Sequence, residues 1–205
     1  MRKVVVTGIG AVTSLGNSFH ESWTSVKKGL SGIAPLTRFD VPLMKWKMSG
    51  ELKCFDAGLY LSQKEMARLD PFVQYAVAAS FMAAKDAGLV QKSLASGGVI
   101  IGSSRGGIST IEDSLIGSSR LRLSPYLMPS TSVNAAASYV AQKLGIKGHC
   151  LGISNACSSG ANAIGEAYRL IKSGYADMVF AGGSEAPLCR LCVEGYGVSG
   201  ALSKI

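Results

Sequence analysis

Four short runs of mostly apolar residues are spaced along the chain, at 4–6, 99–101, 150–154 and 178–181. An apolar run without polar alternation is typical of a strand that is buried on both faces. Helix-like stretches separate these runs, an order that favours a parallel or mixed sheet with helices on both sides. The pattern therefore predicts an α/β fold.

The ends of the predicted helices carry capping residues. Asp70 precedes Pro71, a pair that favours a helix start, and the stretch that follows, to residue 87, is rich in alanine and serine. Gly88 then stands where a C-terminal cap is expected. The many small side chains predict close packing against neighbouring elements. Further helices are expected at 19–28, at the capping box that starts at Ser62, at 135–144 and at 158–172.

The composition predicts a chain that builds a hydrophobic core and does not span a membrane. Apolar residues make up 47% of the 205 residues and charged residues only 17%, which excludes a disordered chain. No apolar run reaches the roughly 18 residues of a membrane span. The start turns polar at Thr7, too early for a secretory signal, and no linker divides the chain. We therefore expect one α/β domain in the cytoplasm, without a membrane segment.

The charge balance favours an acidic partner. The chain carries 21 basic and 13 acidic residues, a formal net charge of +8. The basic residues are scattered, however, and aromatic residues make up only 7%, whereas nucleic-acid binding usually needs a clustered basic stripe or aromatic platforms. We therefore do not expect nucleic acid as the partner.

A glycine loop, Gly8-Ile9-Gly10, follows the first predicted strand and invites comparison with a dinucleotide-binding fingerprint. That fingerprint needs a third glycine, an immediate helix and an acidic residue about 20 positions further on. Here Thr13 occupies the third position, and 26–28 is Val-Lys-Lys, without a carboxylate for a ribose. A tight turn is the better interpretation, and a nicotinamide-dependent oxidoreductase stays as an alternative.

Five cysteines in a chain without a secretory signal predict reduced, mostly buried thiols. Cys189 and Cys192 form a C-x-x-C sequence that fits a redox pair or half of a zinc site. No second C-x-x-C exists, and the two histidines, His20 and His149, are far from it in sequence. We therefore predict no metal site and interpret His149 as structural.

Cys157 lies where a predicted strand ends and a helix begins, within the segment 153–160. Such a junction resembles the elbow that presents a serine nucleophile in hydrolases. The unpaired N–H groups and the dipole of a helix N-terminus stabilise a thiolate, and the N–H groups can also hold an oxyanion, an effect worth roughly 3–4 kcal/mol per donor. Small residues at 158–160 leave room for a substrate. Spacing alone leaves a buried structural cysteine open as the alternative.

Several motifs follow one another in order along almost the whole chain. They are 4–10 with Thr13 and 15–16, Asp70 with 72–76, 129–131 with 133–134, 156–160 with 163–165, 181–185, and 201–203. Together they resemble the β-ketoacyl-acyl-carrier-protein synthases, the condensing enzymes of fatty-acid and polyketide synthesis. The resemblance is specific because it rests on several spaced motifs rather than on one.

The resemblance implies a thiolase-like α/β fold of two similar halves, each with a mixed five-stranded sheet between helices, in proteins that are usually homodimers. It implies that Cys157 accepts an acyl group as a thioester from acyl-carrier protein or coenzyme A, with its own N–H as one oxyanion donor. A malonyl unit then decarboxylates, and its carbanion attacks the thioester in a Claisen condensation. The substrates carry their own phosphopantetheine, so no bound cofactor is expected.

The chain departs from the family in length. Residues 1–205 correspond to an N-terminal ketosynthase domain, and the family's second half, which supplies two histidines and a lysine for decarboxylation, lies outside them. We expect an acylatable thiol that does not catalyse condensation alone. The domain is expected to pair with a C-terminal half or to form a homodimer.

The resemblance also suggests residues for the acyl pocket and its mouth. Arg105 stands where the family often has a small or apolar residue; it could shorten the pocket, bind a polar substrate, or point to solvent or a carboxylate. Arg105 and Ser158 are the candidates for substrate binding. Acyl-carrier proteins are acidic, and complementary charge speeds encounter. The candidates for carrier docking are Lys64, Arg68, Arg120 and Arg122.

Three classes of function follow from the sequence. The leading one is a condensing acyltransferase. The second is a non-catalytic partner subunit of the chain-length-controlling kind, which usually lacks the nucleophile, so that Cys157 argues against it. The third is the nicotinamide-dependent oxidoreductase, which only the glycine loop supports.

Overall fold

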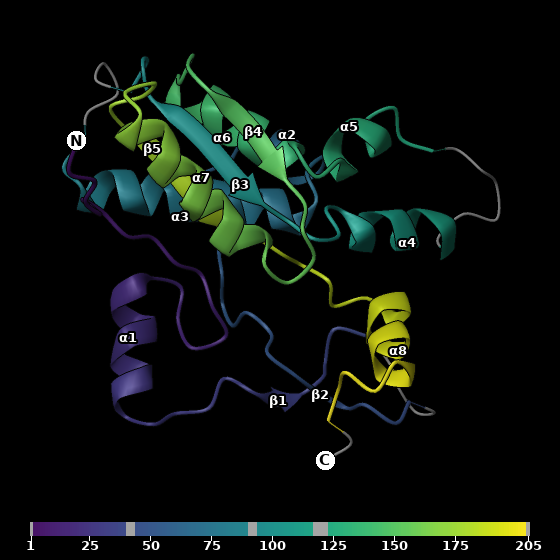
Figure 1. Cartoon of the computed structure of the whole chain (residues 1–205). Coiled ribbons are helices and arrows are strands. Elements are labelled where there is room, and N and C mark those ends of the chain that lie inside the picture. Colours follow the sequence, from purple (N-terminus) through teal and green to yellow (C-terminus); the bar gives the residue numbers. More distant parts are fainter. Residues whose placement is uncertain (1, 40–43, 90–93, 117–122, 204–205) are drawn as a thin grey trace.

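Helices surround a three-stranded sheet in the computed structural model of the chain (Figure 1), which describes residues 2–39, 44–89, 94–116 and 123–203. The strands are β3 (Gly98–Gly102), β4 (Cys150–Ile153) and β5 (Val179–Gly183). They lie in the order β4-β3-β5, and both pairings are parallel. The carboxyl ends of all three strands therefore meet at one edge of the sheet, where the sites of α/β proteins usually lie.

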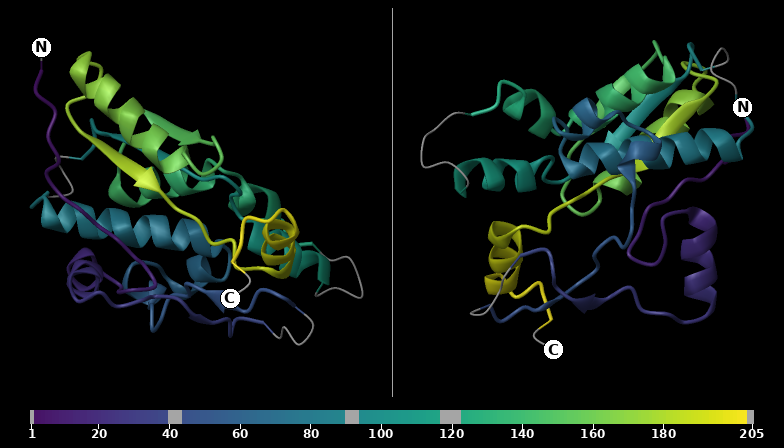
Figure 2. Two further views of the ribbon diagram at one scale, coloured as in Figure 1. Left: turned by 60° about the horizontal axis from the view of Figure 1, so that its bottom comes forward. Right: turned by 180° about the vertical axis from the view of Figure 1, so that it is seen from behind.

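Helices cover both faces of this sheet, as the pattern of apolar runs predicts. Helix α7 (Ser159–Lys172) lies on one face, and α6 (Ala135–Leu144) lies on the other, with α3 (Pro71–Asp86) packed against α6 (Figures 1 and 2). The side chains of β3 alternate between the two faces. Ile100 packs with α7, whereas Val99 and Ile101 belong to the cluster that includes α3 and α6.

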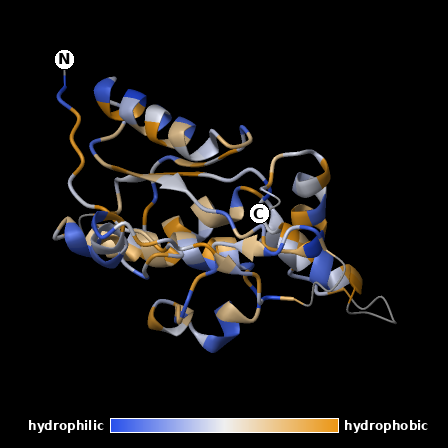
Figure 3. Cartoon of the chain, turned by 90° about the horizontal axis from the view of Figure 1, so that it is seen from below, coloured by the Kyte–Doolittle hydropathy of each residue, from blue (hydrophilic) through white to orange (hydrophobic). Residues whose placement is uncertain are grey.

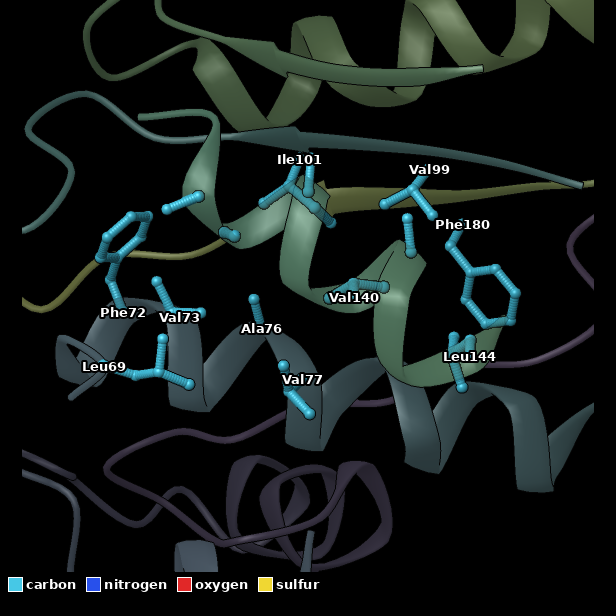
Figure 4. Packing of buried hydrophobic residues seen from close by; sticks show 14 of the residues in the cluster. Leu69, Phe72, Val73, Ala76, Val77, Val99, Ile101, Val140, Leu144 and Phe180 are labelled. Carbon is cyan, nitrogen blue, oxygen red and sulfur yellow. The ribbon is translucent and has the colours of Figure 1, made fainter. Parts of the chain in front are cut away.

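The larger apolar cluster lies between α3, α6 and the sheet, as the close view in Figure 4 shows. Phe72, Val73, Val77, Val99 and Val140 are all completely buried there. Burying a side chain of this size contributes roughly 1.5–3 kcal/mol to folding. This cluster fixes α3 and α6 against the strands and so holds the edge on which the candidate site is built.

The capping signals place the helix ends correctly. Ser62 and Glu65 form a capping box at the start of α2 (Gln63–Met66). Asp70 caps α3, with Pro71 in its first turn, and Gly88 has a φ of 64° just beyond its end. Helix α1 (Phe19–Lys27) and the ends of α6 and α7 also agree with the prediction to within one residue. Across the described ranges, no helix combines the length and the apolar character needed to cross a membrane.

Several short elements are not predicted by the sequence pattern. Strands β1 (Ala34–Pro35) and β2 (Met48–Ser49) form an antiparallel ribbon, and η1 (Ala57–Leu59) is a single 3-10 turn. Helices α4 (Ile108–Ile116), α5 (Leu127–Thr131) and α8 (Arg190–Val198) complete the chain. The ribbon, α1 and α8 lie on the far side of α3 from the sheet, in the lower part of Figure 1.

Helix α8 depends on contacts with distant parts of the chain. Its N-terminal N–H groups, at Arg190 and Leu191, donate to the carboxylate of Glu112 on α4. Its Gly197 lies directly under the ring of Trp46, so closely that a Cβ there would overlap the ring. Glycine is a poor helix former, and this is why local propensity does not predict α8.

The prediction of a mixed five-stranded sheet is wrong for the part of the chain that the structure describes. That part contains a three-stranded parallel sheet and the separate two-stranded ribbon. The run at 4–6, predicted as a buried strand, is extended but pairs with no strand, and the side chains of Val5 and Val6 are 60% and 80% exposed. Figure 3 shows this stretch, next to the N-terminus, along the outside of the molecule. A strand needs a neighbouring backbone to bond, and the described chain supplies none there.

Gly8 and Gly10 are explained by packing rather than by a nucleotide. A Cβ at Gly8 would lie 2.8 Å from the backbone nitrogen of Ala87, and a Cβ at Gly10 would lie 2.8 Å from that of Ala83. The glycines therefore let the N-terminal segment lie directly on α3. The next helix begins only at Phe19, so the immediate helix of a dinucleotide-binding site is missing.

Candidate functional site

The turn between β4 and α7 presents Cys157 to solvent. β4 ends at Ile153 and α7 begins at Ser159, and the thiol between them is exposed. Ala156, immediately before it, has a φ of 48°, a left-handed conformation that residues other than glycine rarely adopt. Such strain tends to occur where the surrounding structure forces a sharp turn, often at functional sites. The predicted strand-turn-helix junction is therefore present.

Two serine hydroxyls hold this turn in place. The Ser159 hydroxyl donates to the carbonyl of Ala156 over 2.6 Å and accepts the N–H of Asn155 over 2.8 Å. The Ser158 hydroxyl donates to the carbonyl of Asn155 over 2.8 Å. The hydroxyl proton of Ser158 is thus used by the turn itself, and a contact of Ser158 with substrate stays a prediction.

Three glycines allow the start of α7 to sit directly on the ends of the strands. A Cβ on Gly160, in the first turn of α7, would lie 3.3 Å from the Cα of Gly183 at the end of β5. A Cβ on Gly102, at the end of β3, would lie 2.7 Å from the backbone nitrogen of Gly160 and would overlap the carbonyl of Ser159. Only residues without a Cβ permit this approach, which fixes the height of Cys157 above the sheet edge.

Glu185 organises the loop that follows β3. Its carboxylate accepts the hydroxyl of Ser103 over 2.5 Å and the backbone N–H groups of Ser104 and Arg105. The N–H of Ser103 in turn donates to the carbonyl of Ile153, at the end of β4, over 3.0 Å. Glu185 was not among the predicted site residues, although its position two residues after the end of β5 places it at the same sheet edge.

Arg105 lies in this loop, and its side chain turns to α8. Its Nε donates to the hydroxyl of Tyr196 over 2.9 Å, and the guanidinium carbon lies 5.6 Å from the centre of that ring. The hydrogen bond to Tyr196 raises the pKa of the exposed Arg105 side chain. The contact with a tyrosine was not foreseen, and binding of substrate by Arg105 stays a prediction.

The structure describes two of the four candidates for carrier docking. Lys64 is exposed on α2, and the guanidinium of Arg68 lies over the ring of Tyr126, 4.1 Å from its centre. Arg120 and Arg122 lie outside the described residues. Lys64 and Arg68 lie four positions apart in the sequence. Tyr126, which Arg68 contacts, is the residue that precedes α5.

An ion pair lies beside these two residues. Lys143 contacts the Glu65 carboxylate over 3.1 Å. Hydrogen bonds from Ser62, with a further contribution from Lys143, lower the pKa of Glu65 to about 2. Glu65 is therefore ionised and paired at neutral pH.

The C-x-x-C sequence is buried at the start of α8. Cys189 is the N-cap of α8, and Cys192 lies one turn further along; both are buried. Burial, together with a hydrogen bond that the Cys192 thiol donates to Cys189, raises the pKa of Cys192 to about 12, which keeps it as a thiol. Within the described ranges, no group of three or more potential metal-ligating side chains comes together. His149 is exposed, and its carbonyl accepts the N–H of Val99 over 2.7 Å, which is a backbone role.

Comparison with known proteins gives a consistent set of relatives. Residues 1–204 match the family model described as "Beta-ketoacyl synthase, N-terminal domain". The chain is 40% identical over 207 residues to the 3-oxoacyl-[acyl-carrier-protein] synthase 2 of Synechocystis sp. and 38% identical to that of Vibrio cholerae. Each alignment covers 98% of this chain and 50% of the relative. The chain therefore spans about half the length of the curated relatives it matches.

Solved structures agree with these matches. The ishigamide ketosynthase/chain length factor superposes with a TM-score of 0.87 at 28% identity, over 98% of this chain and 52% of that one. A β-ketoacyl synthase from Burkholderia phymatum gives a TM-score of 0.86 at 28% identity, over 100% and 52%. A type II polyketide ketosynthase, solved in complex with its acyl-carrier protein, gives 0.81 at 25% identity, over 96% and 55%. These neighbours share the thiolase-like fold with the chain.

Proposed function

Because this chain belongs to the β-ketoacyl synthase family, we propose that it supplies the cysteine-bearing half of a condensing acyltransferase of fatty-acid or polyketide synthesis. The observation that carries the proposal is the exposed Cys157, held by a strained turn at the N-terminus of α7 and at the carboxyl edge of the sheet. The curated relatives named above are 3-oxoacyl-[acyl-carrier-protein] synthases, which is the activity proposed for the whole protein.

The first step takes place on the Cys157 sulfur. The thiolate attacks the carbonyl carbon of an acyl thioester, and the tetrahedral intermediate then expels the thiol of the carrier, which leaves with a proton. The products are an acyl thioester on Cys157 and a free pantetheine thiol. The backbone N–H of Cys157 itself is suited to hold the oxyanion of the tetrahedral intermediate. The pantetheine arm belongs to the substrate, so the step uses no bound cofactor.

The second step needs groups beyond residues 1–205. Malonyl-acyl-carrier protein loses carbon dioxide, and the carbanion attacks the acyl carbon on Cys157, which releases the thiol. Within the described residues, His20 and His149 are both exposed, and neither forms a backbone hydrogen bond with Cys157. We propose that the second half of the protein supplies the decarboxylating residues. A homodimer, a cytoplasmic location and a sheet completed to five strands belong to the same proposal.

We expect the chain to form one acyl adduct when it is incubated with hexanoyl-coenzyme A at neutral pH. Intact-mass spectrometry measures the adduct, and peptide mapping locates it. The adduct should form at Cys157 on the order of 100-fold faster than at the other exposed cysteines, Cys54 and Cys150, because an aligned oxyanion donor contributes a factor of that size.

Matched variants separate this outcome from random acylation. Cys157→Ala removes the adduct, whereas Cys54→Ala and Cys150→Ala leave its rate unchanged. Equal labelling of the three cysteines contradicts a prepared nucleophile. Absence of any adduct in a folded protein that also contains the second half favours a non-catalytic partner subunit.

The solved complex of a type II polyketide ketosynthase with its acyl-carrier protein supports an acyl-carrier protein as the partner of this chain. We expect Arg68→Glu to slow acylation of Cys157 from an acyl-carrier protein about tenfold, because charge complementarity acts mainly on the association rate. Acylation from a small acyl thioester should not change. Lys64→Glu, at an exposed neighbour, should have the same effect without disturbing the Tyr126 contact.

Lys172→Glu is the control for the charge-reversal variants. It changes the net charge equally but lies at the opposite end of α7 from Cys157. Reactions at low and high salt complete the test, since screening should abolish the difference. Equal slowing with the carrier and the small thioester would mean that Arg68 and Lys64 do not dock a carrier.

A further inference from the structure

The carboxylate of Glu185 lies where the three strands of the sheet end, and the acylation step proposed above assigns it no role. Glu185 follows the end of β5 by two residues. The N–H of its neighbour Ser184 donates to the carbonyl of Gly102 over 3.0 Å, and the Ser184 hydroxyl donates to the carbonyl of Phe72 over 2.6 Å. The backbone that carries Glu185 is thus fixed both to the end of β3 and to the start of α3.

The described hydrogen bonds of this carboxylate all end on one oxygen, Oε1. It accepts the Ser103 hydroxyl over 2.5 Å, the Arg105 N–H over 3.3 Å, and the N–H of Ser104. Ser103 is buried, and its hydroxyl oxygen also accepts the N–H of Gly106 over 3.0 Å. No residue that the structure describes forms a hydrogen bond with the second oxygen, Oε2. A single oxygen of Glu185 therefore fixes the course of the loop at 103–106.

This loop begins beside the turn that carries Cys157. Gly102 pairs with Ile153 in the register of β3 and β4, so these two strand ends are adjacent. The Ser103 N–H donates to the Ile153 carbonyl over 3.0 Å, on the N-terminal side of the turn. On the C-terminal side of the turn, Gly102 lies against the carbonyl of Ser159. A shift of the loop therefore moves the backbone on both sides of the thiol.

We propose that Glu185 is a positioning residue for the acylation of Cys157, which it aligns through the loop at 103–106. The proposal rests on the acylation proposed above and adds a residue to it. Attack on a thioester requires the sulfur and the N–H of Cys157 to be aligned with one carbonyl group, and a misplacement of about 1 Å at such a site costs roughly 100-fold in rate. The role depends on the acceptor oxygen rather than on the negative charge, because Oε1 makes all the described bonds.

Glu185→Gln and Glu185→Ala test this role. Glutamine keeps an acceptor oxygen for the three donors, and its amide nitrogen takes the place of Oε2, which no described residue bonds. Alanine removes the acceptor. The acylation rate of Cys157 at saturating hexanoyl-coenzyme A should fall on the order of tenfold in Glu185→Ala and stay close to that of the wild type in Glu185→Gln. An equal fall in both variants would mean that the charge acts, and would overturn the proposal.

Alkylation by iodoacetamide separates alignment from damage to the fold. This reaction displaces iodide and forms no oxyanion, so it needs the exposed Cys157 thiol but not its alignment with a carbonyl group. Peptide mapping should show that Cys157 of Glu185→Ala is alkylated at the wild-type rate. Acylation and alkylation that slow by the same factor would show a general loss of structure instead. Unchanged acylation in Glu185→Ala would show that the loop needs no acceptor.

Glu51→Ala is the matched control. The Glu51 carboxylate also accepts two backbone N–H groups, those of Thr37 and Arg38, together with the hydroxyl of Thr37. It follows β2, on the far side of α3 from the sheet. Its loss should lower the free energy of unfolding, measured by urea titration, without slowing the acylation of Cys157. Slowing equal to that in Glu185→Ala contradicts a specific role of Glu185.

Amide hydrogen exchange tests the alignment without acylation. The amides of Ser103 and Asn155, which donate to Ile153 and Ser159, should exchange about tenfold faster in Glu185→Ala and at the wild-type rate in Glu185→Gln. Unchanged exchange in Glu185→Ala overturns the proposal even if acylation slows. A wild-type chain that forms no acyl adduct contradicts the proposed function, whereas the exchange rates still decide whether Glu185 holds the turn, so the two failures are distinguishable.

Discussion

Replacing Gly102 with alanine is expected to slow acylation of Cys157 on the order of 100-fold, because a displacement of about 1 Å at a reacting group costs roughly that much. The added Cβ overlaps the carbonyl of Ser159 and lies 2.7 Å from the nitrogen of Gly160. These atoms belong to the backbone of the first turn of α7, so no side chain can rotate away. The turn must rise from the sheet edge and carry Cys157 with it.

Stability should fall as well, by roughly 1–3 kcal/mol, the usual cost of overpacking. Acylation is measured by intact mass with hexanoyl-coenzyme A, and the free energy of unfolding by urea titration. Gly165→Ala is the matched control, since it lies in the middle of α7 and a Cβ there meets nothing within 4 Å. It should keep the acylation rate and stabilise the helix by about 1 kcal/mol. If Gly102→Ala is acylated at the wild-type rate, the reactivity of Cys157 does not depend on the close packing between Gly102 and α7.

Asp70→Ala is expected to be the most destabilising polar substitution. The Asp70 side chain is completely buried, and its two oxygens accept the N–H of Phe72 over 2.9 Å and both the N–H and the hydroxyl of Thr110. One carboxylate thus caps α3 and ties it to α4. Alanine leaves these donors without their acceptor, and the loss should be roughly 3 kcal/mol or more. Urea titration of the variant against the wild type measures it.

The pH dependence of stability shows which form of Asp70, protonated or ionised, the folded state stabilises more. Burial raises the pKa of Asp70 above its ordinary value of 3.8, despite the hydrogen bonds that oppose the rise. The folded state therefore binds the proton of Asp70 more tightly than the unfolded state does. The contribution of Asp70 to stability is greatest at pH values below the pKa that Asp70 has in the unfolded state. The difference in unfolding free energy between the wild type and Asp70→Asn should fall as the pH rises above about 4. A difference that grows with pH would show that the ionised form is the better-stabilised one.

Local sequence signals predict the candidate site well. Asp70, Pro71 and Gly88 mark the ends of α3 because each acts on the backbone beside it in the chain. The position of Cys157 between a strand and a helix follows from the same kind of signal, and the structure agrees with it. The family resemblance from spaced motifs is also confirmed by the family model.

Contacts between distant residues could not be read from the sequence. Glu185 holds the loop at Ser103–Arg105 from about 80 positions away, and Tyr196 binds Arg105 from 91 positions away. The glycines at 102 and 160 are visible in the sequence, but only the fold shows that Gly102 lies against the backbone of Gly160 and that Gly160 lies against the backbone of Gly183. These contacts depend on how the strands are ordered in the sheet, which short-range patterns do not encode.

The sequence by itself determined the apolar runs, the helix ends and the junction that carries Cys157, because these features are set by neighbouring residues. Only the tertiary structure decided that the run at 4–6 is not a paired strand. Its apolar residues suit a buried strand, but a strand exists only where another backbone accepts its hydrogen bonds. In the described chain, the edge of β5 and this segment face each other across an apolar cleft without meeting.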